Sequence, residues 1–147
     1  MFYICAKIGI VKLSLLKFIP AVLWMGVIFI LLVMPNDDIP NSFFAFIPNF
    51  DKLVHAGIFG FEVLMLAWPF FSTPLATRKT FLKITIGVIA YGVIMEFVQK
   101  LTPDRDYDTL DMVADSIGAV IAFFVANAWF KLYAKKKQQR LAKNKPL

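Results

Sequence analysis

Residues 18–34 read FIPAVLWMGVIFILLVM, seventeen consecutive residues without a charged side chain. A helix needs roughly 20 apolar residues to cross the ~30 Å hydrocarbon core of a bilayer, so this stretch predicts a membrane span. Three further apolar stretches follow, at residues 53–71, 81–98 and 110–133. Most of each stretch is apolar all round, whereas a helix of a soluble bundle keeps one polar face. The sequence therefore predicts an all-α fold, a four-helix transmembrane bundle.

The composition agrees with a membrane protein and excludes an ordinary soluble enzyme domain. Of the 147 residues, 59% are hydrophobic and 18% are charged, against roughly 45–50% and ~25% in soluble domains. The length suits one domain, in which we expect residues 18–133 to form the membrane part. A basic segment, residues 1–17, precedes it, and a basic tail, residues 134–147, follows it. The single cysteine, Cys5, permits no intramolecular disulfide.

The basic residues are distributed unevenly and orient the predicted bundle. Thirteen of the sixteen lie before the first span, around the turn between the second and third spans, or in the last part of the chain. Because positively charged loops stay in the cytoplasm, we expect both termini to be cytoplasmic and the chain to be a multi-pass protein of the bacterial cytoplasmic membrane. Topology and contact with anionic membrane lipids then explain the net charge of +6, and we expect no nucleic-acid partner.

The remaining ionisable residues collect near the opposite, extracytoplasmic surface. On the second span Asp51 and His55 lie on one helix face, and on the fourth span Asp108, Asp111 and Asp115 share another. Ionised groups in a span are costly to turn toward lipid, so we expect these faces to point inward and meet in a polar pocket open to the outside. The candidate site residues are Asp51, Lys52, His55, Glu96, Gln99, Arg105, Asp108, Asp111 and Asp115.

Helix capping offers a structural explanation for some of these residues. Asn49 followed by Asp51 suits the start of a helix, and Asp108 with Asp111 three residues on resembles a capping box with Asp in place of Glu. Carboxylates also suit the positive end of a helix dipole. Capping leaves three members of the set unexplained, namely His55, Glu96 and Asp115.

Ion pairing offers a second structural explanation. Glu96 is spaced to pair with Lys100 on the next turn of the third span. Glu62 lies deeper on the second span, on the same face as His55. An intramembrane carboxylate by default marks a functional site, but pairing with a neighbour would explain Glu62 equally well.

The order and spacing of the polar motifs resemble those of a known family. Five pieces carry the likeness: Asp51-Lys52-Leu53-Val54-His55, Glu96-Phe97-Val98-Gln99, Arg105 with Asp108, Asp111 with Asp115, and Gly118. Over roughly residues 18–128 the chain resembles the VanZ-like family of small bacterial membrane proteins. One departure is Asp115, where the family pattern more often carries Asn. The resemblance implies a cell-envelope context with a link to glycopeptide (teicoplanin) tolerance, rather than a particular reaction.

The favoured hypothesis for the site is binding of a cell-envelope component, either a protein partner or a lipid with an anionic headgroup. Lys52 and Arg105 supply cations suited to phosphate, and Arg105 can bind it bidentately. Apolar helix walls would hold the lipid tail. The residues expected to contact this ligand are Lys52, Gln99, Arg105, Asp108 and Asp115.

An alternative hypothesis is a membrane enzyme or carrier acting on a polyprenyl-phosphate-type lipid. His55 beside Asp51 would transfer a proton, with Glu96 and Asp111 as further acid–base candidates. No Gly-rich phosphate loop or nucleophile motif supports this hypothesis. One His with several carboxylates suits magnesium, manganese or calcium better than zinc, and both metal and cofactor are left open. A third hypothesis is a structural bundle whose buried ion pairs set helix register.

Overall fold

The structure, a computed structural model, describes residues 2–6, 9–34, 49–102 and 108–143. Its main elements are the helices α1 (Ile19–Val33), α2 (Phe50–Ala67), α3 (Arg78–Gln99) and α4 (Thr109–Lys143). The 3-10 turn η1 (Leu15–Phe18) lengthens α1, and η3 (Trp68–Phe70) lengthens α2. With these turns, the described chain has four helices long and apolar enough to cross a membrane. The predicted all-α architecture of four candidate spans is therefore confirmed.

The helix boundaries follow local chemistry. Pro20 is the second residue of α1, where its missing N–H costs nothing. The α-helical part of α2 ends just before Pro69, which cannot donate the next helical hydrogen bond. Thr77 caps α3, since its hydroxyl accepts the backbone N–H of Thr80 at 3.1 Å. These signals are short-range, so the boundaries of α1, α2 and α3 lie within a few residues of their predicted places.

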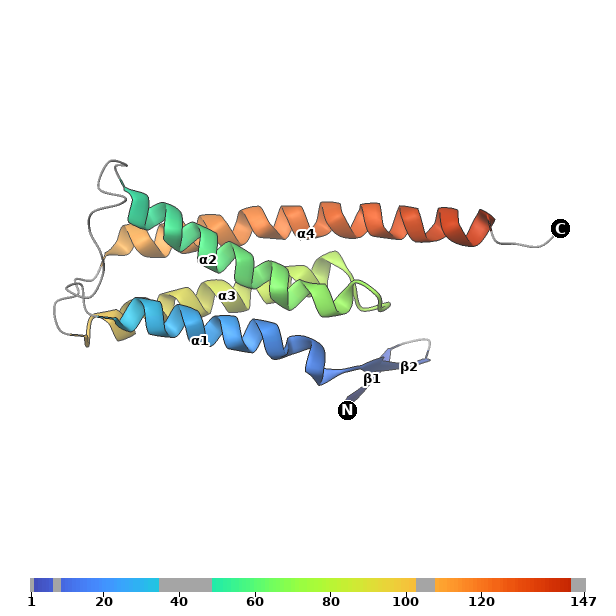
Figure 1. Ribbon diagram of the computed structural model, residues 1–147, viewed down its shortest axis with the longest axis horizontal. Coiled ribbons are helices and arrows are strands. Elements are labelled where there is room, and N and C mark those ends of the chain that lie inside the picture. Colours follow the sequence, from blue (N-terminus) through green and yellow to red (C-terminus); the bar gives the residue numbers. More distant parts are fainter. Residues whose placement is uncertain (1, 7–8, 35–48, 103–107, 144–147) are drawn as a thin grey trace.

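The four helices run up and down side by side, which gives the bundle two distinct ends (Figure 1). One end holds the start of α1, the end of α2 and the start of α3, and both chain termini lie on that side. We call it the terminal end. The other, the loop end, holds the end of α1, the start of α2, the end of α3 and the start of α4. The termini therefore share one side of the bundle.

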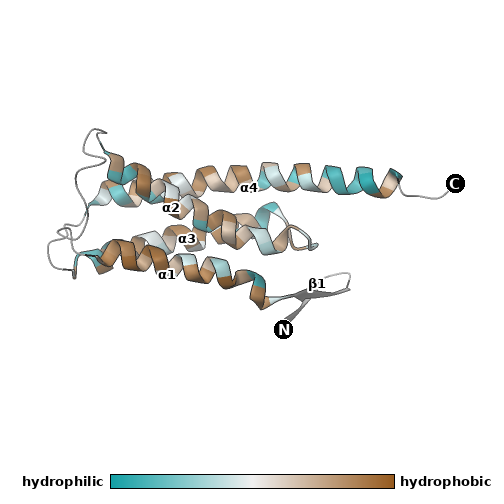
Figure 2. Cartoon of the chain, in the orientation of Figure 1, coloured by the Kyte–Doolittle hydropathy of each residue, from teal (hydrophilic) through white to brown (hydrophobic). Residues whose placement is uncertain are grey.

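Two segments differ from the sequence-based expectation. The basic N-terminal segment contains a short antiparallel strand pair, β1 (Phe2–Ala6) with β2 (Gly9–Leu13), which was not predicted. The basic tail predicted from residue 134 is helical up to Lys143, because α4 continues into it without a break. At 1.5 Å per residue, the 35 residues of α4 extend about 52 Å, well beyond the ~30 Å of hydrocarbon. Figure 2 shows the change from hydrophobic to hydrophilic residues along this helix.

The bundle buries a narrow apolar core and exposes large hydrophobic side chains outward. The core joins all four helices through residues such as Ile28, Phe59, Val88 and Ala119. Outward-facing residues include Leu23 of α1, Ile86 and Ile94 of α3, and Ile117 and Phe124 of α4, each about half exposed or more. Lipid is the solvent in which such exposure is favourable, so the surface agrees with a multi-pass membrane protein.

Small residues bring α2 and α4 into close contact. A Cβ atom added to Gly118 would overlap the backbone carbonyl of Ala56. A Cβ added to Gly60 would lie 2.9 Å from the carbonyl oxygen of Gly118. Small residues four apart are a known device for close helix packing in membranes, and here they set the distance across which the side chains of the loop end meet.

Candidate functional site

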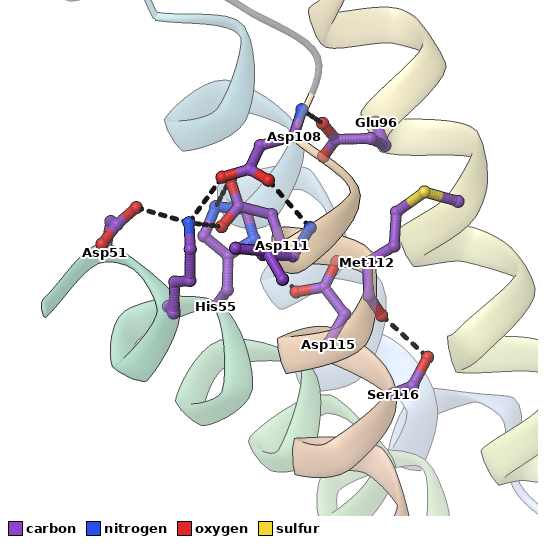
Figure 3. A network of polar contacts seen from close by, with 10 residues as sticks. Asp51, His55, Glu96, Asp108, Asp111, Met112, Asp115 and Ser116 are labelled. Carbon is purple, nitrogen blue, oxygen red and sulfur yellow. Dashed lines mark hydrogen bonds and ion pairs between the residues drawn. The ribbon is translucent and has the colours of Figure 1, made fainter. Parts of the chain in front are cut away.

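The polar residues of α2, α3 and α4 meet at the loop end in one group of hydrogen bonds and ion pairs (Figure 3). We call this group the polar cluster. It consists of Asp51, Lys52, His55, Glu96, Asp108, Asp111 and Asp115. The predicted convergence of the three helix faces is therefore present in the structure.

Lys52 lies at the centre of three carboxylates. Its Nζ donates to Asp51 Oδ2 at 2.9 Å, to Asp108 Oδ2 at 2.7 Å and to Asp111 Oδ1 at 2.8 Å. An ammonium group has three N–H donors, so these contacts use all of them. Lys52 therefore ties the start of α2 to the start of α4, and it is available to another ligand only if one carboxylate leaves.

His55 is paired with Asp115 of α4. Its Nδ1 lies 3.0 Å from Asp115 Oδ1, and its Nε2 lies 3.9 Å from Asp111 Oδ2, beyond hydrogen-bond length. Both paired side chains are more than nine-tenths buried. With Asp115 ionised, the bond requires the proton on Nδ1 and directs Nε2 toward Asp111. The pair fixes the ring orientation and, with Asp115 ionised, the tautomer as well.

A glycine makes room for this pair. A Cβ added to Gly92 of α3 would lie 2.9 Å from Asp115 Oδ2 and 3.3 Å from the ring of Phe59. With a side chain at this position, the Asp115 carboxylate or its neighbours would have to shift from their place between α3 and α2. Gly92 was not among the predicted site residues, and a glycine within an apolar span at the level of a carboxylate is the signal that would have found it.

The start of α4 is capped from two sides. Asp108 Oδ1 accepts the backbone N–H of Leu110 at 2.8 Å, which confirms the predicted capping role of Asp108. The reciprocal contact of a capping box comes from α3 instead of from Asp111, because Glu96 Oε1 accepts the backbone N–H of Asp108 at 2.6 Å. The predicted pairing of Glu96 with Lys100 is wrong, since no such ion pair occurs among the described residues.

Two contacts predicted on α2 are also different. Asp51 does not pair with His55 but bonds Lys52, and its side chain is 61% exposed. Asn49 precedes α2 with a left-handed backbone (φ 57°) and makes no side-chain capping bond. A shared helix face brings residues i and i+4 near each other, but the better partner of His55 lies on the neighbouring helix.

The last two predicted site residues are placed only in part. Gln99 is buried at the end of α3, at the same end of the bundle as the polar cluster. Arg105 lies outside the described residues. Asp115 was also expected to contact a ligand. In the structure it is paired with His55 inside the protein instead.

The charge of the polar cluster is predominantly negative, with five carboxyl groups against Lys52 and His55. The hydrogen bond from Lys52, followed by that from the N–H of Leu110, holds the pKa of Asp108 below its usual range. Among the described residues, no group of three or more His, Cys, Asp or Glu side chains is arranged to hold a metal ion. The Lys52 ammonium is the cation that these carboxylates surround.

An apolar groove lies on α4 on a different side of the helix from the carboxylates of the polar cluster. It has a volume of about 580 Å³ and runs from Thr109, next to Asp108, along the lipid-facing side of α4. The groove residues are Val93 of α3 and Thr109, Met112, Val113, Ser116, Ile117, Val120 and Ile121 of α4. The groove residues include none of the polar cluster, and Thr109, which follows Asp108 in the sequence, is the groove residue nearest to it along the chain.

Comparison with known proteins adds no further assignment. No protein-family model matches the chain, and no match was found among curated proteins or solved structures. The resemblance to the VanZ-like family therefore rests on the residue motifs alone and stays a prediction.

Proposed function

We propose that the chain is a VanZ-like membrane protein whose polar cluster binds the headgroup of a cell-envelope lipid at the extracytoplasmic surface. The observation that carries this proposal is the placement of a cation, Lys52, among ionisable side chains at the loop end, at the level where the apolar groove on α4 begins with Thr109. A lipid has the same two-part chemistry, an apolar chain joined to a polar head. The family-level link to teicoplanin tolerance is consistent with such a site but is not part of the proposal for this chain.

The bonding of Lys52 defines how an anionic headgroup would enter. Its three partners differ in exposure, and the side chain of Asp51 is the most exposed at 61%, against 40% for Asp108 and 14% for Asp111. A phosphate oxygen would therefore replace Asp51 at the ammonium group, at the least cost in buried contacts. Arg105, by its charge and its place in the sequence, would be the second cation for the phosphate.

Native mass spectrometry of the purified protein tests the proposal. We expect a retained phospholipid or polyprenyl-phosphate adduct on the wild type, lost or at least tenfold weaker in Lys52→Gln. In Asp51→Asn the adduct should be stronger, because the neutral amide competes less for Lys52. Lys100→Gln is the matched control, since Lys100 is an exposed cation at the same end of the bundle. An unliganded mass for the wild type under all conditions contradicts the binding proposal.

The groove is tested separately by filling it. Ile117→Trp places a large side chain in the groove, and we expect it to weaken the lipid adduct while leaving the polar cluster intact. Ile86→Trp is the matched control, because Ile86 is similarly exposed on the lipid-facing surface of α3 but outside the groove. Equal adducts in both variants would contradict a lipid tail in this groove.

Thiol labelling in intact cells tests the proposed orientation. With Cys5 replaced by serine, Leu101→Cys introduces an exposed thiol at the loop end, and Lys79→Cys introduces one at the terminal end. An impermeant reagent should label position 101 and not position 79. The opposite pattern would place the polar cluster at the cytoplasmic surface.

A membrane enzyme is the second candidate function, and the buried His55–Asp115 pair favours it. A carboxylate that orients an imidazole through Nδ1 leaves Nε2 for proton transfer, as in general acid–base catalysis. Turnover of a labelled polyprenyl-phosphate lipid by the purified protein is the direct assay. Loss of that turnover in His55→Ala and Asp111→Asn, with insertion and yield unchanged, supports an enzyme. Turnover that survives both changes contradicts the roles of His55 and Asp111, and a wild type without turnover contradicts the enzyme.

A further inference from the structure

Glu62 lies near the middle of α2, away from the polar cluster. Its side chain is completely buried, with 0% of the residue exposed. Neither carboxyl oxygen has a hydrogen-bond partner among the residues that the structure describes. The pairing with a neighbour that would have explained this residue is therefore not found in the described part of the chain.

The surroundings of Glu62 offer little to compensate a charge. Its α2 neighbours Phe59 and Val63 belong to the apolar core that α1, α3 and α4 complete. The helix α1 carries no titratable side chain, and α4 carries none between Asp115 and Lys131. On α3, Tyr91 is close enough to Glu62 for their charges to interact, but its hydroxyl donates to the backbone oxygen of Met25 at 2.9 Å.

An apolar layer separates Glu62 from the polar cluster. Phe59 lies one turn from both His55 and Glu62 on the same face of α2 and is completely buried. Its ring packs against that of Tyr91, with the ring centroids 5.9 Å apart. Neither Lys52 nor His55 forms a hydrogen bond with Glu62. Both are bonded to carboxylates of the polar cluster instead. Glu62 therefore forms a second, independent polar position in the bundle.

An ionised carboxylate in such a place is strongly disfavoured, because no hydrogen-bond donor within the described ranges replaces the lost hydration. A neutral carboxylic acid avoids most of that penalty. We propose that Glu62 is a proton-binding site in the interior of the bundle, occupied while α2 is packed and released when the bundle opens to water. The ligand is a proton, and the packed arrangement of α2 against α3 and α4 is the state that holds it.

Linkage gives this proposal a definite sign. An unfolded chain releases the proton of a glutamate above about pH 4.3, whereas the folded protein keeps the Glu62 proton. Because the folded state then binds more protons, its stability falls as pH rises. For one such group, the ratio of folded to unfolded protein falls by up to about tenfold for each unit that the pH rises. Glu62→Gln keeps the shape of a neutral acid and removes this dependence.

Unfolding measured between pH 5 and 8 in detergent micelles tests the proposal. Relative to Glu62→Gln, the wild type should lose stability steadily as pH rises, so that the variant is the more stable protein at pH 8. His55 titrates in both proteins and cancels in the comparison. Asp51→Asn, a carboxyl change at an exposed position of the same helix, should leave the wild-type pH dependence unchanged. Parallel curves for wild type and Glu62→Gln would overturn the proposal.

Infrared spectroscopy observes the proton directly. At neutral pH we expect a carbonyl stretch of a protonated carboxylic acid that shifts in D₂O and is lost in Glu62→Gln but retained in Asp51→Asn. An identical band in wild type and Glu62→Gln would overturn the assignment. Stability of the wild type that rises with sodium or potassium concentration, and does not in Glu62→Gln, would also overturn it, because a metal cation and not a proton would then occupy the site.

Discussion

The two ends of the bundle are held together by different kinds of contact. At the terminal end, aromatic rings pack against one another, with Phe71 contacting Phe81, Trp129 and Phe130 at centroid distances of 5.7–6.2 Å. The basic residues there are mostly exposed, although Arg78 lies over the ring of Phe123 at 5.8 Å. At the loop end, ionisable side chains bond one another, and several are buried.

The difference predicts how each end responds to substitution. Ring packing is distributed over many weak contacts, so the loss of one exposed charge at the terminal end changes little. A buried hydrogen-bonded group depends on every member, because removing one leaves its partner without hydration or a bond. We therefore expect the loop end to be the sensitive one, and the changes below run from the largest effect to the smallest.

Gly118→Ala should have the largest effect. The added Cβ would overlap the carbonyl of Ala56, which forces α2 and α4 apart and lengthens every bond between them at the loop end. Overpacking of this kind costs about 3 kcal/mol. Gly87→Ala is the matched control, because a Cβ at Gly87 meets nothing within 4 Å. Denaturant unfolding in micelles measures both, and equal stability of the two variants would contradict the role assigned to Gly118.

Lys52→Met should come next. The change leaves three carboxylates around a side chain without charge, and for a partly buried group we expect a loss of about 2 kcal/mol. Lys83→Met removes an exposed lysine near the terminal end, so its effect should lie within about 0.5 kcal/mol of zero. Similar losses for the two variants would remove the distinction between the ends.

Asp115→Asn should have a smaller effect on stability, about 1 kcal/mol, because the amide still offers one hydrogen bond to His55. Its main effect should be on the imidazole tautomer. His55 is the single histidine, so nitrogen NMR of labelled histidine reports it alone. The Nδ1-protonated form should dominate in the wild type and decrease in the variant, and an unchanged tautomer would contradict the pairing.

Acid should weaken the loop end slightly through Asp108. Its lowered pKa in the folded protein means that its bond to Lys52 adds stability at pH values above the unfolded value of about 3.9. That contribution disappears as pH falls through the folded value. The wild type should therefore lose more stability than Asp108→Asn between pH 5 and 3. A larger loss in the variant would reverse the sign and contradict the inferred bond.

Hydropathy was sufficient to predict the four spans, because the length of an apolar run is set by bilayer thickness and needs no knowledge of neighbouring helices. Helix periodicity also predicted that the helix faces that carry His55 and the carboxylates would converge. It failed on partners, since Asp51 was expected beside His55 and Asp115 is found there. It also missed Gly92, and Gly118 was noted only as part of the family motif, although small residues at positions 114, 118, 122 and 126 of α4 follow the four-residue spacing of a close helix contact.

By itself the sequence determined which segments can span a membrane and which side chains cannot face lipid, because both depend on transfer from water to hydrocarbon. The tertiary structure alone decided which of those side chains have partners. The close approach of α2 and α4 at Gly118 brings Asp108 and Asp111 to Lys52 and Asp115 to His55. One turn beyond Phe59, the same helix face leaves Glu62 buried without a partner among the described residues. Side chains on one face of α2 thus differ in their electrostatic environment. Those at the loop end have charged partners and Glu62 does not among the described residues, because the neighbouring helices set the environment.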